Sequence, residues 1–186
     1  DSALSRRLRG DLNRIEQYVD MAMTYLRLDA ETGDYVFKRQ PLEPIVRGAV
    51  RKFAGEFIDR KLGLRLKPME NIVLTDEKWL SFIVEQLLSN ALKYTPAGEI
   101  SIYTQTPDTL VIRDTGIGIA PEDLPRIFEK GFTGYNGRSD KKASGIGLYL
   151  CKRVCDRLGH ELSVESEPGK GTAVFLKLDR REIGIE

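Results

Sequence analysis

Four short segments of the sequence carry residue types whose spacing could do chemistry. In the first, Asp114 follows the apolar run "LVIR" and precedes "TGIG", which contains Gly116 and Gly118. A carboxylate at a strand end can accept a hydrogen bond from an exocyclic amine, and glycine lets the backbone approach a ligand closely. Taken alone, the segment is also typical of a tight turn after a strand.

The second segment is "EQLLSNALKYT", residues 85–95, in the C-terminal half of an expected helix. Glu85, Asn90 and Lys93 are spaced so that they can lie near one side of that helix. Asparagine is a poor helix former, so Asn90 needs another justification, and its amide oxygen is a ligand suited to Mg²⁺. A solvated polar face is the alternative interpretation of this segment alone.

The other two segments are glycine pairs. In "SGIGLYL", Gly145 and Gly147 immediately precede an expected helix, whose N-terminal N–H groups and dipole can bind an anion. In "GKGT", residues 169–172, the glycines fit the turn of a hairpin. Each pair is an ordinary feature when it stands by itself.

An N-terminal helix over residues 3–28 is expected to carry an apolar seam. Its members alternate at spacings of four and three: Leu4, Leu8, Asp11, Ile15, Val19, Ala22 and Leu26. Asp11 interrupts the seam, and Leu12 beside it partly fills the gap. This near-heptad pattern predicts a helix that packs against other helices, and turn residues 31–34 end it.

Residues 35–182 are expected to form one compact unit with strands and helices in irregular order. The sequence predicts strands in "YVFKRQ", "LRLKP", "IVLTD", "EISIYTQ", "TLVIRD", "ELSVES" and "TAVFLKL", and helices over 42–61, from Asp76 to about Tyr94, and over 145–158. Residues 129–144 have few apolar side chains and are expected to be mobile. Because the βαβ alternation is absent, we predict an α+β fold, a two-layer sandwich with helices covering one face of a mixed sheet.

Composition excludes several classes of protein. The 186 residues include 29 Lys and Arg against 28 Asp and Glu, and this balance argues against general nucleic-acid binding. No run approaches the roughly 18 apolar residues of a membrane-spanning helix, so we expect a soluble chain. Cys151 and Cys155, four residues apart on an expected helix, are interpreted as small core residues in a reducing compartment.

The order of these segments resembles the ATP-binding domain of sensor histidine kinases. The Asn-bearing helix is followed by Asp-x-Gly-x-Gly, a Phe in "RIFEKGF", Gly-x-Gly-Leu at a helix start, and Gly-x-Gly-Thr. The wider superfamily also contains gyrase B, Hsp90 and MutL. The resemblance covers about residues 35–180, and it implies an ATP-dependent enzyme with that superfamily's sandwich fold.

The family's first motif is similar to residues 85–94 of this chain. By resemblance, Asn90 is the magnesium ligand and Lys93 contacts phosphate, while Tyr94 forms part of the nucleotide pocket. Glu85 stands where the family carries an acidic or amide residue that helps activate the phosphoacceptor histidine. The implied cofactors are therefore ATP and Mg²⁺.

The remaining motifs resemble the adenine side and the lid of the family's site. Asp114 matches the aspartate that bonds the adenine amino group, and the neighbouring glycines shape the pocket wall. Phe128 matches the start of the lid. Three further segments match the lid-closing motif and the motif at the adenine edge: Gly145, Gly147 and Leu148, then Gly169, Gly171 and Thr172.

One position departs from the family pattern. Many histidine kinases carry an arginine shortly after the lid phenylalanine, where this chain has Thr133. Lys130 and Arg138 are the candidates to replace it as γ-phosphate contacts. The lid sequence "GFTGYNGR" and the end "LGHELSVESEPGKGT" resemble a Gram-positive group of kinases that sense cell-envelope antibiotics.

The resemblance also implies partners. The N-terminal helix, residues 1–30, looks like the second helix of the dimerisation and phosphotransfer hairpin, which would make the intact protein a homodimer that phosphorylates a response regulator. The first helix, with the acceptor histidine, and any membrane anchor would precede this chain, and residues 35–182 would be cytoplasmic. His160, at a helix end, is not expected to be the acceptor.

Two other functions share these motifs. One is an ATP-driven conformational machine of the Hsp90 or MutL type. The other is a non-catalytic nucleotide-binding module, held open by the altered lid. Nucleotide binding with and without Mg²⁺ separates the second alternative from the other functions.

Overall fold

The computed structural model describes residues 8, 12, 15, 18–27, 35–134 and 145–178. The chain divides into two compact units, residues 1–34 and 35–186. Along the described part of the chain, no helix has the length and apolar character needed to cross a bilayer.

The first unit contains a helix with an exposed apolar surface. Residues 18–27 are helical, as are the three isolated described positions before them. The large apolar side chains on this helix are exposed: Leu8, Leu12, Ile15, Tyr18, Val19, Met23 and Leu26. Two positions of the predicted seam, Leu4 and Asp11, and the predicted turn at 31–34 lie outside the described residues.

The second unit is built on a five-stranded sheet in the order β2-β4-β5-β7-β6. The strands are β2 (Gly63–Leu66), β4 (Glu99–Thr106), β5 (Thr109–Asp114), β6 (Glu161–Glu167) and β7 (Gly171–Lys177). The β2–β4 pair is parallel, and the other pairs are antiparallel. A separate two-stranded sheet pairs β1 (Lys38–Pro41) with β3 (Ile72–Thr75).

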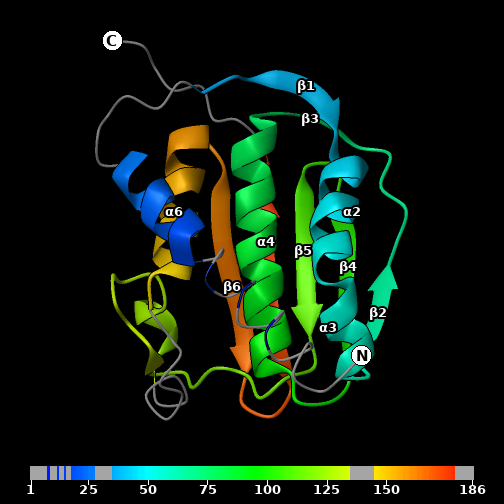
Figure 1. The fold of residues 1–186 in the computed structure, drawn as a ribbon, viewed down its shortest axis with the longest axis vertical. Coiled ribbons are helices and arrows are strands. Elements are labelled where there is room, and N and C mark those ends of the chain that lie inside the picture. Colours follow the sequence, from blue (N-terminus) through cyan, green and yellow to red (C-terminus); the bar gives the residue numbers. More distant parts are fainter. Residues whose placement is uncertain are drawn as a thin grey trace. The chain divides into compact units, whose positions relative to one another are not determined.

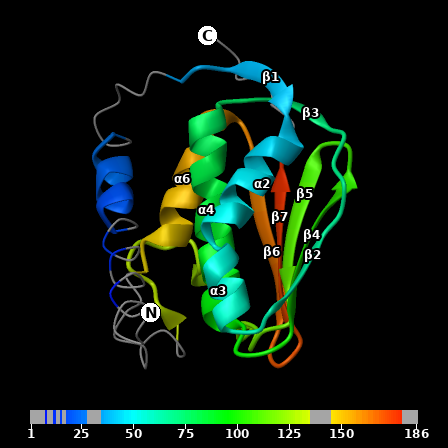
Figure 2. The same ribbon diagram turned by 45° about the vertical axis from the view of Figure 1, so that its right-hand side comes forward.

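The helices lie on one face of the five-stranded sheet (Figure 2). They are α2 (Leu42–Lys52), α3 (Ala54–Asp59), α4 (Glu77–Tyr94) and α6 (Gly147–Leu158), and a short 3₁₀ helix, η1 (Leu124–Arg126), precedes the predicted lid. In Figure 1, α4 runs down the middle of this layer, between α2 and α6. The predicted two-layer α+β sandwich is confirmed.

The apolar face of α4 is the centre of the core. Asp76 caps its first turn by accepting a hydrogen bond from Trp79 N at 3.2 Å, as the sequence predicts. The predicted buried positions of α4 are buried, together with Trp79 and Leu92: Leu80, Ile83, Val84, Leu87, Leu88 and Ala91. Their spacing at three and four residues places them along one side of the helix.

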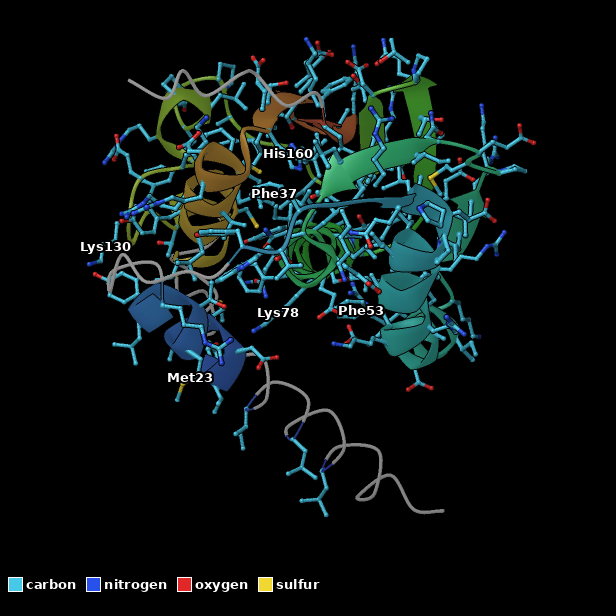
Figure 3. All side chains as sticks on the ribbon, turned by 90° about the horizontal axis from the view of Figure 1, so that it is seen from above. Met23, Phe37, Phe53, Lys78, Lys130 and His160 are labelled. Atoms are coloured by element: carbon cyan, nitrogen blue, oxygen red, sulfur yellow. The ribbon has the colours of Figure 1, made fainter. Side chains whose placement is uncertain are left out.

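The helix predicted over 42–61 is instead two helices. Phe53, labelled in Figure 3, interrupts the helical backbone with φ of −97° and ψ of 4° and serves as the cap between α2 and α3. Its N–H donates to Val50 O at 3.1 Å, which is the tighter spacing of a 3₁₀ turn. Because the Phe53 side chain is buried, the break is anchored in the core.

Two sequence interpretations concern the C-terminal end of α6. Cys151 and Cys155 are buried free thiols, and burial raises the pKa of Cys155 to about 12, so both are core residues. His160 follows the C-cap of α6, at the helix end where the sequence places it. Its backbone N–H donates to Cys155 O at 2.9 Å, while its imidazole Nε2 shares a hydrogen bond of 2.9 Å with Thr75 Oγ1, in the interior of the unit.

Candidate functional site

Three of the segments singled out in the sequence meet at one end of the second unit, and the fourth, the start of α6, lies against Gln86 in the middle of α4. The start of α6 is higher in Figure 1, whereas the C-terminal end of α4, the end of β5 and the β6–β7 turn lie at its bottom. Specific contacts connect them: Ile117 N donates to Tyr94 O at 3.0 Å, and Thr172 N donates to Asp114 Oδ1 at 3.2 Å. These two contacts join residues that are 23 and 58 positions apart in the sequence.

Asp114 is the buried carboxylate of this site, with 6% of its surface exposed. Its Oδ1 accepts hydrogen bonds from Gly116 N at 2.8 Å and from Thr172 N. Burial raises the pKa of Asp114, while these two N–H groups and the Thr95 hydroxyl act in the opposite direction. A buried carboxylate that is held in place in this way is suited to accept a hydrogen bond from one polar group of a ligand.

The glycines near Asp114 are required by close contacts within the protein backbone. A Cβ at Gly116 would lie 2.3 Å from Tyr94 O, one at Gly118 would lie 2.1 Å from Glu167 O, and one at Gly171 would lie 2.0 Å from Asp114 O. Gly118 and Gly171 also have positive φ, 71° and 95°. The sequence explained Gly116 and Gly118 by a ligand's approach, whereas here the neighbouring carbonyl groups already exclude any side chain.

The two glycines of the β6–β7 turn, Gly169 and Gly171, have different surroundings. Gly169 has φ of 77°, but no atom lies within 4 Å of a Cβ built on it, so it is an ordinary turn glycine. Gly171 is tightly enclosed, and Thr172 beside it shares a hydrogen bond of 2.9 Å with Ser166 Oγ. Ser166 Oγ in turn accepts from Ile119 N at 2.9 Å, which ties the β6–β7 turn to the segment after Asp114.

The last turns of α4 present partly exposed polar side chains. Asn90, Lys93 and Tyr94 all have intermediate exposure, and the Lys93 ammonium lies 5.1 Å from the centre of the Tyr94 ring. Thr95, the C-cap residue, is buried and donates from its hydroxyl to Ala91 O at 2.7 Å. The amide and the ammonium can serve a metal-bound, negatively charged ligand.

Glu85 and Gln86 face different neighbours. Glu85 is ion-paired to Lys52 of α2, with 2.8 Å between Oε1 and Nζ. The Gln86 Oε1 atom lies 3.1 Å from the position that a Cβ on Gly147 would occupy, so Gln86 is the residue against the start of α6. Sequence reasoning missed Gln86, although residues four apart on a helix differ by only about 40° in direction, which places it beside Asn90.

The described ends of the lid segment are joined to each other. Gly131 N donates to Gly145 O at 3.0 Å, and a Cβ at Gly145 would lie 2.5 Å from the Gly131 carbonyl carbon. Before this junction, Phe128 is partly buried, and the Arg126 guanidinium lies 4.5 Å from the centre of the Phe132 ring. Gly131 and Gly145 therefore lie side by side.

The candidate γ-phosphate contacts lie on this segment. Lys130, labelled in Figure 3, is exposed, and Thr133 is partly buried. Arg138 and the rest of the predicted lid, residues 135–144, lie outside the described residues. Gly147 is the first residue of the twelve-residue helix α6, and Leu148 follows it with intermediate exposure. The start of this helix can bind an anion through its N–H groups.

Comparison with known families identifies the fold and its superfamily. Residues 75–182 match the model of the family described as histidine kinase-, DNA gyrase B-, and HSP90-like ATPase, and this span is more than half of the chain. The chain belongs to this family. Its predicted resemblance to that superfamily is therefore confirmed.

Curated relatives are sensor proteins. The chain is 38% identical to the sensor protein BceS of Halalkalibacterium halodurans over 183 residues, which are 95% of this chain and 55% of that protein. It is 38% identical to the sensor histidine kinase GraS of Staphylococcus haemolyticus over 172 residues, 90% of this chain and 50% of GraS. The chain thus spans about half the length of the curated relatives it matches.

Solved structures share the fold at lower identity. Full-length ShkA in complex with AMPPNP superposes with a TM-score of 0.74 at 21% identity, over 95% of this chain and 39% of ShkA. The Acinetobacter baumannii histidine kinase AdeS gives a TM-score of 0.73 at 19% identity, over 98% of this chain and 86% of AdeS. These likenesses confirm the predicted sandwich.

Proposed function

We propose that this chain is the catalytic part of a sensor histidine kinase. It binds ATP with Mg²⁺ and transfers the γ-phosphoryl group to a histidine on a dimerisation helix, for relay to a response regulator. The observation that carries the proposal is the enclosed Asp114 carboxylate, bonded to Gly116 N and Thr172 N beside the polar end of α4. The family match and the sensor-kinase relatives favour this function over an Hsp90- or MutL-type machine.

Asp114 recognises the adenine base in this proposal. Its carboxylate is positioned by two backbone N–H groups and keeps acceptor capacity for an exocyclic amino group. The surrounding glycines hold the backbone close to the carboxylate and leave no side chain between it and a ligand. A base with a carbonyl oxygen in place of the amino group would meet the negative charge unfavourably, so adenine is selected.

The phosphates and Mg²⁺ fit the polar end of α4 and the start of α6. Asn90 offers a hard oxygen ligand, and Mg²⁺ commonly completes its shell with water and substrate phosphates. Lys93 and Lys130 supply positive charge, and the N–H groups of Gly147 and Leu148 are part of the positive end of the α6 dipole. Bound Mg²⁺ neutralises phosphate charge that develops during transfer.

The transfer step requires only positioning and charge stabilisation from this chain. An imidazole nitrogen forms a bond to the γ-phosphorus as the bond to the β–γ bridging oxygen breaks, and ADP leaves with that electron pair. The assignment of Glu85 to activation of the acceptor stays a prediction. Because Glu85 is paired with Lys52 while Gln86 lies against Gly147, we favour Gln86 for a contact at the phosphate end.

Dimerisation, membrane attachment and the signal are proposed for the intact protein. The exposed apolar side chains at Leu8, Ile15 and Val19 suit a helix that pairs within a four-helix bundle. The intact protein is proposed to be a membrane-anchored homodimer with this unit in the cytoplasm, as the resemblance to sensor histidine kinases implies. The resemblance to the antibiotic-sensing group gives a cell-envelope antibiotic as the proposed signal.

Incubation with γ-labelled ATP and Mg²⁺ tests the proposed function. His160 is 4% exposed and bonded to Thr75, so the chain alone should take up no acid-labile label. A separately supplied dimerisation hairpin with its acceptor histidine should become labelled when this chain is added. Label on the chain that disappears in His160→Ala would contradict the assignment, and ATP binding without any transfer would identify a non-catalytic module.

A further inference from the structure

The guanidinium of Arg60 lies at the functional end of α4. Arg60, the C-cap residue of α3, donates from Nη1 to Leu92 O and from Nη2 to Thr95 O, the second at 2.8 Å. Carbonyl groups in the last turn of a helix have no partner within that helix, and they carry the negative end of its dipole. A two-pronged cation is therefore well matched to this position.

The turn that contains Arg60 is held in an unusual conformation. Lys61, the next residue, has φ of 54°, and among the described residues it is the one non-glycine with positive φ. Its N–H donates to Ile58 O at 3.1 Å, and Leu62 N closes the turn on Phe57 O at 3.0 Å. A left-handed lysine is energetically unfavourable, so the surrounding structure must hold this turn in place.

Arg60 bonds the last turn of α4, and this turn also contacts residues 114–118, the segment that contains Asp114. Tyr94, between the two bonded carbonyl groups, accepts from Ile117 N at 3.0 Å through its own carbonyl. The Thr95 Oγ1 atom lies 2.9 Å from where a Cβ on Gly116 would stand, and the Thr95 hydroxyl lowers the pKa of the Asp114 carboxyl. Thr95, whose carbonyl group Arg60 bonds, therefore lies directly against the segment that begins at Asp114.

We propose that Arg60 is a positioning residue for base recognition. By holding the Leu92 and Thr95 carbonyl groups together, it fixes the end of α4 against Asp114 and Gly116. It touches neither the base nor the phosphates, and it acts through Thr95. This inference rests on the proposed function, because it assigns Arg60 to the adenine end of the same site.

The choice of arginine is part of the inference. A guanidinium presents several N–H donors in a planar fork and can bond two carbonyl groups at once, whereas an ammonium is a compact point charge. Arg60→Lys should therefore keep the charge but lose the two-point hold. Arg65, on β2, is a matched control, because it forms an exposed ion pair of 3.1 Å with Glu99 on the neighbouring strand β4.

Calorimetric titration with ADP and with inosine diphosphate tests the proposal. Inosine carries a carbonyl oxygen where adenine has its amino group, so the ratio of the two affinities measures base recognition. Arg60→Ala should lower the affinity for ADP about tenfold and change that for inosine diphosphate much less. The reason is that the lost charged hydrogen bonds hold the end of α4 against Asp114, and in the proposal Asp114 binds only the amino group of adenine. Arg60→Lys should fall between, and Arg65→Ala should match the unaltered chain.

Two results would overturn the inference. An unchanged affinity ratio in Arg60→Ala and Arg60→Lys, with both affinities either retained or reduced in parallel, would reduce Arg60 to a general structural residue. If Arg60→Ala does not fold, Arg60→Lys alone decides. Absence of ADP binding by the unaltered chain would instead show that the proposed function itself is wrong.

Discussion

The two ends of α4 are constructed in different ways. At the N-terminal end, the Asp76 carboxylate accepts from Trp79 N and from Val36 N at 2.7 Å, and the Trp79 ring lies 5.6 Å from that of Tyr35. At the C-terminal end, partly exposed Asn90 and Lys93 stand beside backbone segments that glycines allow to approach closely. One end is closed by side chains of its own unit, and the other presents polar groups.

The N-terminal end of α4 therefore contributes to the stability of the unit, whereas the C-terminal end provides polar groups for binding a ligand. Asp76 satisfies N–H groups that would otherwise lack partners, and aromatic packing around Trp79 removes apolar surface from water. The other end keeps a buried carboxylate, Asp114, whose pKa is raised by burial. Such a group costs stability and is retained where a ligand needs it. Substitutions of the two carboxylates, Asp76 and Asp114, should therefore have opposite effects on stability and binding.

The largest expected effect is on the glycine backbone of the binding end. Gly171→Ala should lower the free energy of unfolding by about 3 kcal/mol or more, because its Cβ would collide with Asp114 O at a positive φ. Gly169→Ala, in the same turn with open space around it, should cost only about 1 kcal/mol. Urea unfolding of both variants makes the comparison, and equal losses would contradict the steric argument.

The next effect separates binding from stability at Asp114. Asp114→Asn keeps an oxygen for Gly116 N and Thr172 N but presents an amide donor to the adenine amino group, so ADP affinity should fall at least about tenfold. Equal proportional losses for adenine and inosine nucleotides would contradict adenine readout.

The contribution of the Asp114 carboxyl to stability has a defined dependence on pH. Because the pKa of Asp114 is raised in the folded state, its contribution to stability is present at low pH and is lost as pH rises through that raised pKa. At neutral pH, Asp114→Asn should therefore unfold at an equal or higher urea concentration. A loss of more than about 1 kcal/mol would show that the charge stabilises the fold.

A smaller effect is expected from the opposite end of α4. Asp76→Ala should lower the free energy of unfolding by about 1–2 kcal/mol, because it removes the helix cap and the bond to Val36 N. ADP affinity should change by less than about twofold, since sites far apart act nearly independently. Asp76→Asn, which can still cap, is the control. A large loss of affinity in Asp76→Ala would show that the two ends are coupled.

The sequence predicts features that depend on local pattern or on motif order. The buried face of α4 follows from its periodicity, and the Asp76 cap from its position before the helix. Family resemblance implies that Asp114 and the Gly-Thr segment both lie on the adenine side of the site. The break at Phe53 is not predicted, because nothing in the local pattern interrupts the amphipathic run. There, burial of one side chain in the core outweighs continuation of the helix.

Contacts between distant residues could not be predicted from the sequence. Arg60 bonds carbonyl groups 32 and 35 positions away, and Thr75 meets His160 across 85 positions. Such contacts depend on how helices and strands pack, which no local spacing encodes. Gln86 is a different case, because its spacing of four residues from Asn90 is a local signal that favours it over Glu85.

In the proposed function, Asn90 at the C-terminal end of α4 binds Mg²⁺, and Asp114 at the end of β5 binds the adenine of ATP. Calorimetric titration of a non-hydrolysable ATP analogue, with Mg²⁺ and with a chelator, tests it on the unaltered chain and on Asn90→Ala. We predict one binding site per chain, tighter binding with Mg²⁺, and loss of that Mg²⁺ dependence in Asn90→Ala with the free energy of unfolding changed by less than about 0.5 kcal/mol. Equal Mg²⁺-dependent affinity in the two proteins would contradict the account.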